Sequence, residues 1–321
     1  MPAVYVVSPS SSPLPFPRRR ARAEQELRRR FRRVTFGPCW TGDGDGDARA
    51  ASAPSRAQEI SEAVAAGATL LLGATGGWTC NEVLPFVDFE LIRERRAVVC
   101  GFSDVSALLV AIYARTGVEA IHGPTALPSY GEAGGIDDAS HGHLLETLAG
   151  AEHEVPAPER STGESRRWEE LDDDRRARRP VGRWRCLREG TASGPLVAVN
   201  MDVLERLVGT SYMADLAGHV LLLDDVGESP GRMMSQLVHL RQAGVLDDVC
   251  ALVFARFPDA APAQRAAREA VLEEVAGWMS GPVVADVDFG HTAPMCSLPL
   301  GRCLRIQAHR GHVGLRLMAR A

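Results

Sequence analysis

The chain has 321 residues, of which 45% are hydrophobic and 24% are charged, and its formal net charge is −5 with a sequence pI near 6.0. This length supplies enough apolar material for one large or two medium domains, and we expect two. The acidic balance gives no electrostatic footprint for a phosphate backbone, which argues against nucleic acid as a partner. No run approaches the roughly 18 apolar residues of a membrane span, and the N-terminus lacks the positively charged start of a signal peptide.

All 36 basic residues are arginine, because the sequence contains no lysine. This excludes a lysine Schiff base with pyridoxal phosphate, a P-loop lysine on a nucleotide phosphate, and a Ser-Lys dyad. The seven cysteines are scattered and never form a C-x-x-C pair. We therefore expect free thiols and a cytoplasmic, reducing location.

Helical and strand-like segments alternate along the first half of the chain. A strand is predicted at residues 3–8 and an exposed amphipathic helix in the arginine-rich segment 17–33. The segments that follow are helix 56–66, strand 69–72, helix 82–94, strand 97–100 and helix 105–115. Such alternation predicts a parallel sheet flanked by helices.

The composition changes between residues 151 and 182, where three prolines flank a dense stretch of mixed charge. Such a stretch is typical of a linker or a long surface loop. Beyond it, a second α/β domain is predicted from strands 196–199, 220–223, 251–254 and 283–287 and helices 233–243 and 263–278. We therefore divide the chain into an N-terminal domain 1–150, a linker 151–185 and a C-terminal domain 186–321.

A serine lies at the junction of a predicted strand and a predicted helix, in Gly101-Phe102-Ser103-Asp104. At such a turn the hydroxyl stands clear of the backbone, and the first helical amides face a developing oxyanion, with the Asp104 amide as the natural first donor. The pattern is related to the nucleophile elbow, although Val105 replaces its second glycine. The same residues also fit an ordinary helix cap.

A glycine-rich turn, Gly73-Ala74-Thr75-Gly76-Gly77-Trp78, follows the predicted strand 69–72. Its backbone amides could supply the second oxyanion donor, and Gly77 is our preferred position. An ordinary tight turn explains the glycines equally well. A dinucleotide site is disfavoured because the G-x-G-x-x-G spacing is not met.

Two further segments carry a base and an acid. His291 follows the strand 283–287, a place that suits a general base, and His122 competes for the role. The strand 220–223 runs directly into Asp224-Asp225, with Glu228 close behind. A carboxylate at the end of a buried strand is well placed to orient a histidine, although solvated loop acids fit the same pattern.

Taken together, these segments resemble the LD-carboxypeptidase family, including its microcin C self-immunity branch. The motifs occur in the family's order over most of the chain and are Val6-Val7-Ser8-Pro9-Ser10, Ser55-Arg56-Ala57, Gly76-Gly77-Trp78, Gly101-Phe102-Ser103-Asp104, His122-Gly123-Pro124, Gly209-Thr210-Ser211-Tyr212-Met213, Leu223-Asp224-Asp225, Arg256-Phe257 and Phe289-Gly290-His291-Thr292.

The resemblance implies an α/β fold of two domains. The first is a flavodoxin-like or class I glutaminase-like parallel sheet with helices on both faces, and the second is a swivelling β/β/α-type domain. It also implies a homodimer and a Ser-Glu-His triad that spans the cleft between the domains. Mapped by motif, Ser103 is the nucleophile and His291 is the base.

Two departures from the family pattern affect the expected site. Asp224 stands where the family carries glutamate, and the shorter acid must approach the imidazole more closely, unless Asp225 or Glu228 serves instead. The segment Val197-Ala198-Val199-Asn200 replaces a Gly-Gly-Asn turn that lines the cleft in relatives. We therefore expect an altered substrate preference, with Asn200 as a substrate-binding candidate.

The resemblance implies two substrate classes, the L-to-D amide of murein tetrapeptides and peptidyl or aminoacyl nucleotide antibiotics. The Trp78 loop is closer to the self-immunity branch, in which an interdomain tryptophan stacks on the nucleobase; Trp168 is the candidate here, or it simply covers apolar surface. The leading hypothesis is hydrolysis through acylation of Ser103, with no metal or organic cofactor needed. The alternatives are acyl transfer to an amine by a biosynthetic enzyme, and a binding protein that has lost catalysis.

Overall fold

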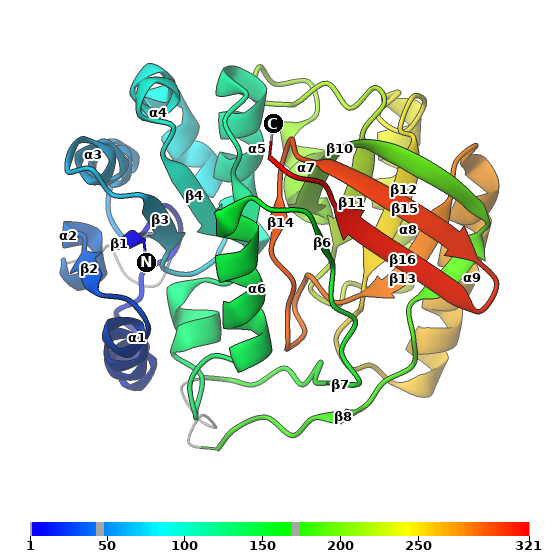
Figure 1. The fold of residues 1–321 in the computed structure, drawn as a ribbon, viewed down its shortest axis with the longest axis horizontal. Coiled ribbons are helices and arrows are strands. Elements are labelled where there is room, and N and C mark those ends of the chain that lie inside the picture. The colour runs from blue at the N-terminus through cyan, green and yellow to red at the C-terminus, as the bar shows by residue number, and fades with distance from the viewer. Residues whose placement is uncertain (1, 43–47, 169–173, 321) are drawn as a thin grey trace.

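The computed structural model describes residues 2–42, 48–168 and 174–320. Two sheets lie beside each other, the first built mainly from the N-terminal half and the second mainly from the C-terminal half (Figure 1). No helix in these ranges combines the length and apolar character that crossing a membrane requires.

The first sheet has the strand order β14-β5-β4-β3-β1-β2. Its parallel strands are β1 (Ala3–Val7), β2 (Arg33–Phe36), β3 (Leu70–Gly73), β4 (Val98–Gly101) and β5 (Ile121–His122). The sixth strand, β14 (Leu298–Pro299), runs antiparallel to β5 and comes from the far end of the sequence.

Both faces of the first sheet are buried. Its helices are α1 (Pro17–Arg30), α2 (Pro38–Thr41), α3 (Ala53–Ala65), α4 (Phe89–Arg95), α5 (Ser106–Thr116) and α6 (Asp138–Ala149). Leu70 and Leu72 pack in one apolar cluster with α1 and α6, whereas Leu71 packs in another with α3, α4 and α5. Because successive strand residues point to opposite faces, this alternation places helices on both sides.

The second sheet has the order β6-β16-β15-β10-β11-β12-β13-β9. Its parallel centre is β10 (Gly190–Asn200), β11 (Val220–Asp224), β12 (Ala251–Ala255) and β13 (Val283–Val287). Antiparallel strands flank it, namely β6 (His153–Glu154), β9 (Arg185–Arg188), β15 (Cys303–His309) and β16 (His312–Leu317). Its helices are α7 (Met201–Leu207), α8 (Pro230–Gln242) and α9 (Pro262–Trp278), and a separate ribbon pairs β7 (Arg160–Ser161) with β8 (Arg179–Pro180).

The predicted α/β class with two sheets and helices on both faces of the first is confirmed, and the seven cysteines are free thiols. The single helix predicted over 82–94 is wrong. The chain instead forms a 3₁₀ helix at Cys80–Phe86 and then α4, because Pro85 lacks an amide hydrogen and Asp88 starts a new helix by accepting from the Leu91 amide at 2.9 Å.

The domain boundaries remain a prediction. The predicted linker 151–185 contains β6, which pairs with β16 of the second sheet, and both strands of the small ribbon. Residues 169–173 of that linker lie outside the described residues.

A buried carboxylate connects α3 to the end of β1. Glu59 is fully buried, and its carboxylate accepts the backbone amide of Ser8 at 2.6 Å and that of Cys39 at 2.8 Å. Burial raises the pKa of Glu59 to about 7, against the two amide hydrogen bonds that favour its charged form. The loop that follows β1 is therefore hydrogen-bonded to an acid, Glu59, that is protonated below about pH 7.

This raised pKa predicts a pH-dependent stability. The folded state favours the protonated acid, so the free energy of unfolding should fall as the pH rises from about 4.5 to about 7. At about 1.4 kcal/mol per pKa unit, the contribution is roughly 3 kcal/mol. Urea unfolding of Glu59→Gln between pH 5 and 8 should lack this part of the slope, whereas Glu62→Gln, an exposed acid of the same helix, should keep it. Equal slopes for wild type and Glu59→Gln would refute the assignment.

Candidate active site

Ser103 occupies a strained turn between β4 and α5. Its φ is +58°, which is unusual for a residue with a side chain and marks a place where the surroundings hold the backbone. A 3₁₀ turn, Ser103–Val105, leads into α5, and the Ser106 hydroxyl donates to the Ser103 carbonyl at 2.5 Å. The Asn200 amide in turn donates to the Ser106 hydroxyl at 3.2 Å, so the C-terminal half also holds this turn.

The glycine-rich turn after β3 lies against the serine. A Cβ on Gly76 would come within 2.9 Å of both Cβ and Oγ of Ser103, so only glycine allows this approach. Gly77 has a φ of +144°, which also favours glycine. The Ser11 amide donates to the Gly76 carbonyl at 3.3 Å, and in a trans peptide the Gly77 amide then points the opposite way, away from Ser11.

The Asp104 amide belongs to the first turn after β4, where amides have no partner within the helix. A Cβ on Gly76 would lie 3.5 Å from this amide nitrogen, so the glycine-rich turn and the first helical amides border the same space. The Asp104 side chain is turned inward and is 1% exposed. Its Oδ2 accepts from the Ser10 hydroxyl at 2.5 Å and the Cys80 amide at 2.7 Å.

His291 and Asp224 contact each other directly. Asp224 ends β11, and His291 lies in the loop after β13, with its Nδ1 at 3.1 Å from Oδ1 and 2.9 Å from Oδ2 of the acid. The His291 backbone amide donates to the same Oδ1 at 3.2 Å. The carboxylate packs so closely on the loop that a Cβ on Gly290 would lie 1.8 Å from Oδ1. Glycine is therefore required immediately before the histidine.

The charge state of Asp224 depends on this contact. The acid is fully buried, which by itself raises its pKa, but the charge and the hydrogen bond of His291 prevail and hold the pKa of Asp224 below its ordinary value. The imidazole also packs against Phe102, with ring centroids 5.0 Å apart at an angle of 64°. Since Phe102 precedes Ser103 in the chain, this packing places His291 beside the serine turn.

The competing acids have other partners, and His122 lies near Asp224 and His291 but does not line the cavity. The Asp225 carboxylate accepts the amides of Gly227 and Glu228 at 2.5 and 2.8 Å and so closes the loop after β11. The Glu228 carbonyl accepts from Arg268 at 3.3 Å, and neither acid lines the cavity that holds His291. His122 is fully buried, which lowers its pKa to about 4 and keeps the ring neutral.

A cavity of about 610 Å³ contains most of the predicted site residues. Those that line it are Ser103, His291, Gly77, Trp78 and Trp168, together with Gly76 and Phe102. Trp78, which also lines the cavity, is 68% exposed to solvent. Trp168 contacts Phe16 edge to face with centroids 5.1 Å apart and lies under the guanidinium of Arg19 at 4.2 Å.

The segment that replaces the Gly-Gly-Asn turn does not line this cavity. Val197–Val199 pair with Leu221–Leu223 inside the second sheet and are fully buried. Asn200 caps α7 by accepting the Val203 amide at 3.3 Å. The valines therefore fill core volume, and the altered substrate preference and the substrate-binding role of Asn200 remain predictions.

Residues 4–123 match the LD-carboxypeptidase N-terminal domain, and residues 193–306 match the LD-carboxypeptidase C-terminal domain. The chain belongs to the LD-carboxypeptidase family. It is accordingly a hydrolase that acts on peptide bonds, as the sequence motifs predict. Ser103 lies in the N-terminal matched region, and Asp224 and His291 lie in the C-terminal one.

Individual members of the family resemble the chain over most of its length. The microcin C7 self-immunity protein MccF of Escherichia coli is 29% identical over 274 residues, which cover 83% of this chain and 79% of the relative. The crystal structure of an MccF-like protein from Bacillus anthracis has a TM-score of 0.90 at 26% identity and covers 99% of this chain and 97% of that one. MccF in complex with aspartyl sulfamoyl adenosine has a TM-score of 0.88 at 26% identity, covering 99% and 96%.

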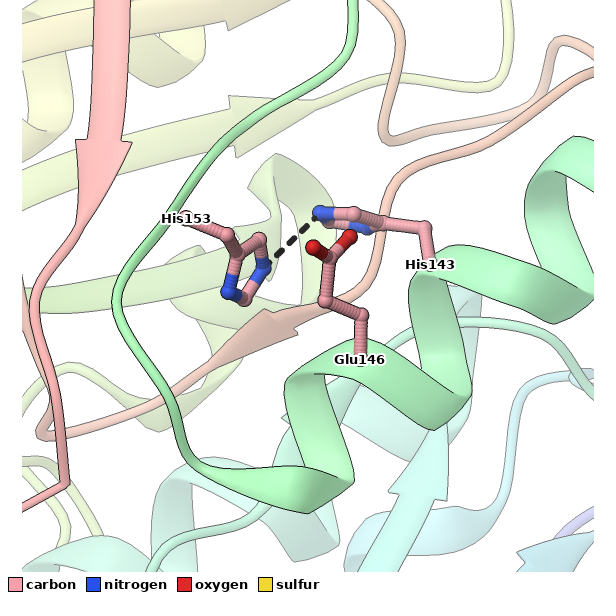
Figure 2. Close-up of side chains that lie close together, drawn as sticks. All are labelled: His143, Glu146 and His153. Atoms are coloured by element: carbon pink, nitrogen blue, oxygen red, sulfur yellow. Dashed lines mark hydrogen bonds between the residues drawn. The ribbon is translucent and has the colours of Figure 1, made fainter.

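One cluster away from the cavity has the spacing of metal ligands. His143 and Glu146 lie one turn apart on α6 and face His153 of β6 (Figure 2). However, His143 Nδ1 accepts the Ser297 amide at 2.9 Å, while His153 Nδ1 lies 3.0 Å from the Ala151 carbonyl and must donate to it.

These partners fix which ring nitrogens carry protons. The only proton of neutral His143 is on Nε2, which donates to Nε2 of His153 at 3.2 Å (Figure 2). Burial, with the nearby His153, lowers the pKa of His143 to about 3, so the ring stays neutral. A metal between the rings would have to displace that proton, so we interpret the pair as a structural contact between α6 and β6.

The contact between His291 and Asp224 predicts a distinctive NMR signal. The proton on His291 Nδ1, held by a buried carboxylate, should be strongly deshielded and slow to exchange. Asp224→Ala should abolish that resonance, whereas Asp225→Ala should retain it, since Asp225 is bonded to loop amides. Proton spectra of the two variants, with His291→Ala for assignment, check this. If Asp225→Ala lost the signal and Asp224→Ala kept it, Asp225 would be the acid that holds His291, and the assignment of Asp224 would be wrong.

Proposed function

We propose that Ser103, His291 and Asp224 form a catalytic triad that hydrolyses an amide bond in a small peptide or a peptidyl or aminoacyl conjugate. The observation that carries the proposal is the contact between buried Asp224 and His291, whose histidine lines the same cavity as a serine held at a positive φ. Membership in a peptidase family supplies the reaction class.

In this proposal each group has a role that its contacts support. Asp224 holds the Nδ1 proton of His291, which leaves Nε2 free to take the proton of the Ser103 hydroxyl as Oγ attacks the amide carbonyl. The amides of Gly77 and Asp104 then stabilise the oxyanion. His291 returns the proton to the leaving amine, an acyl-enzyme forms on Ser103, and a water molecule activated by His291 releases the acyl group.

The aromatic side chains in the cavity favour a substrate that carries a flat ring. Trp168, Phe16 and Arg19 form an aromatic and cationic wall in the same cavity as Ser103. The MccF structure with aspartyl sulfamoyl adenosine holds an aminoacyl group joined to a nucleoside. We propose the same arrangement here, with the acyl group at Ser103 and the base near Trp168. The homodimer and the cytoplasmic location remain predictions.

Replacement of the nucleophile is the direct test of the triad. Ser103→Ala should lower amide hydrolysis by at least about 10⁴-fold, because covalent catalysis is lost while the oxyanion donors remain. A fluorophosphonate probe should label Ser103 in the wild type, as mass mapping of the labelled peptide will show, and His291→Ala should label at least about 100-fold more slowly. Ser12→Ala, a buried serine outside the cavity lining, serves as control. Turnover retained by Ser103→Ala would end the proposal.

A second comparison tests the aromatic wall. Stacking of a base on an aromatic side chain is worth about 1–3 kcal/mol, so Trp168→Ala should raise KM for an aminoacyl sulfamoyl adenosine roughly 5- to 150-fold. Trp168→Phe should recover part of the loss, and cleavage of a plain peptide of the same acyl group should be unchanged. An equal loss on both substrates would assign Trp168 a purely structural role.

A further inference from the structure

Arg206 of α7 reaches from the C-terminal half to two backbone segments that border Ser103. One guanidinium nitrogen donates to the Trp78 carbonyl at 3.1 Å, and the other donates to Oδ1 of Asp104 at 3.0 Å. The Arg206 side chain is 29% exposed, while that of Asp104 is 1% exposed. Arg206 does not line the cavity, so it does not belong to the substrate-binding wall described above.

The Asp104 carboxylate that Arg206 contacts joins three loops. Oδ1 accepts from Arg206, whereas Oδ2 accepts the Ser10 hydroxyl at 2.5 Å and the Cys80 amide at 2.7 Å. The loop of Ser10 is also bound to the glycine-rich turn, because the Ser11 amide donates to the Gly76 carbonyl. The loops after β1, β3 and β4 are therefore connected through one buried carboxylate and one guanidinium.

This network surrounds the two amides assigned to the oxyanion. Gly77 immediately precedes Trp78, whose carbonyl Arg206 holds, and the second amide is that of Asp104 itself. An oxyanion must lie about 2.7–3.1 Å from both donors, so the separation of the two amides decides whether both can act. The planar guanidinium has donors in a fixed geometry and can span both acceptors, which a flexible ammonium cannot.

We propose that Arg206 is the positioning residue of the oxyanion site, so that docking of the C-terminal half sets the spacing of two amides that belong to the N-terminal half. This inference rests on the proposed function, because it takes the Gly77 and Asp104 amides as the oxyanion donors. Arg206 itself touches no reacting atom; it acts through Trp78 and Asp104. Its effect is therefore expected on the transition state and not on substrate affinity.

A matched control lies on the neighbouring helix. Arg232 of α8 donates to Asp202 at 3.2 Å and to Glu205 at 2.6 Å, and Arg206 also contacts Asp202 at 3.3 Å. Both arginines thus pair with the same acid of α7, but the contacts of Arg232 with α7 stay within the C-terminal half. Arg232→Met measures the effect of losing an arginine from this charge cluster without disturbing the Trp78 and Asp104 segments.

The test compares Arg206→Met, Arg206→Lys and Arg232→Met in the full chain. With a cleavable aminoacyl sulfamoyl adenosine, Arg206→Met should lower kcat about 100-fold and change KM less than about 2-fold, as expected for loss of an oxyanion donor. Arg206→Lys keeps the charge beside Asp104 but cannot span both acceptors, so it should recover about 10-fold. Arg232→Met should match the wild type.

Hydrogen exchange supplies a readout that does not depend on turnover. Peptides covering residues 74–80 and 102–106 should exchange faster in Arg206→Met, while peptides from α8 and α9 should be unchanged. If Arg206→Met does not fold, Arg206→Lys and Arg206→Gln carry the same comparison. A rise in KM with unchanged kcat, an equal loss in Arg232→Met, or unchanged exchange in these two segments would each overturn the inference.

Failure of the proposed function would look different. If Ser103→Ala retained turnover, the triad would be wrong, yet the exchange measurement would still decide whether Arg206 holds the two segments. If Ser103→Ala is inactive while Arg206→Met keeps full kcat, the triad stands and the role given to Arg206 falls.

Discussion

The hydrogen bond between Asp224 and His291 is the interaction on which the rest of the site depends. A fully buried carboxylate is tolerated because it accepts hydrogen bonds from both the ring and the backbone amide of His291, and the same two bonds orient the imidazole. Gly290 leaves room for this double contact. Asp224 therefore reaches His291 without the extra methylene of a glutamate, because the backbone at Gly290 and His291 packs directly on its carboxylate.

The serine depends on the other half of the molecule as much as the histidine does. Asn200 and Arg206, both from the C-terminal half, contact Ser106 and Asp104, which lie just after Ser103 in the chain. The apolar cluster of α5 continues without a break into β10 and β11. Strain at a positive φ persists only where the surroundings hold it, and here those surroundings come from both halves.

Local sequence patterns predicted much of the fold and the principal site residues. Buried runs such as 97–100 and 220–223 read as strands, and glycines and polar residues at their ends marked Ser103, Gly77 and Asp224. The alternation of Leu304, Ile306 and Ala308 with polar residues in β15 also indicates a strand of the C-terminal hairpin, which is absent from the predicted elements.

Contacts between distant segments could not be predicted in this way. Nothing local shows that Arg206 meets Asp104, that Arg19 lies over Trp168, or that Val197 faces the core. Each depends on how two sheets pack, which periodicity leaves undetermined. The motifs indicated the candidate site residues because they resemble the family's pattern in order, whereas the supporting contacts follow from this chain's own packing.

The placement of β14 has a consequence for synthesis. Residues 298–299 complete the first sheet beside β5, yet they emerge from the ribosome almost 180 residues after it. A nascent N-terminal half has an open sheet edge at β5 until the chain is nearly finished, and its serine turn lacks support until Asn200 and Arg206 are made. In the proposed triad, every translation product that ends before His291 therefore lacks its base.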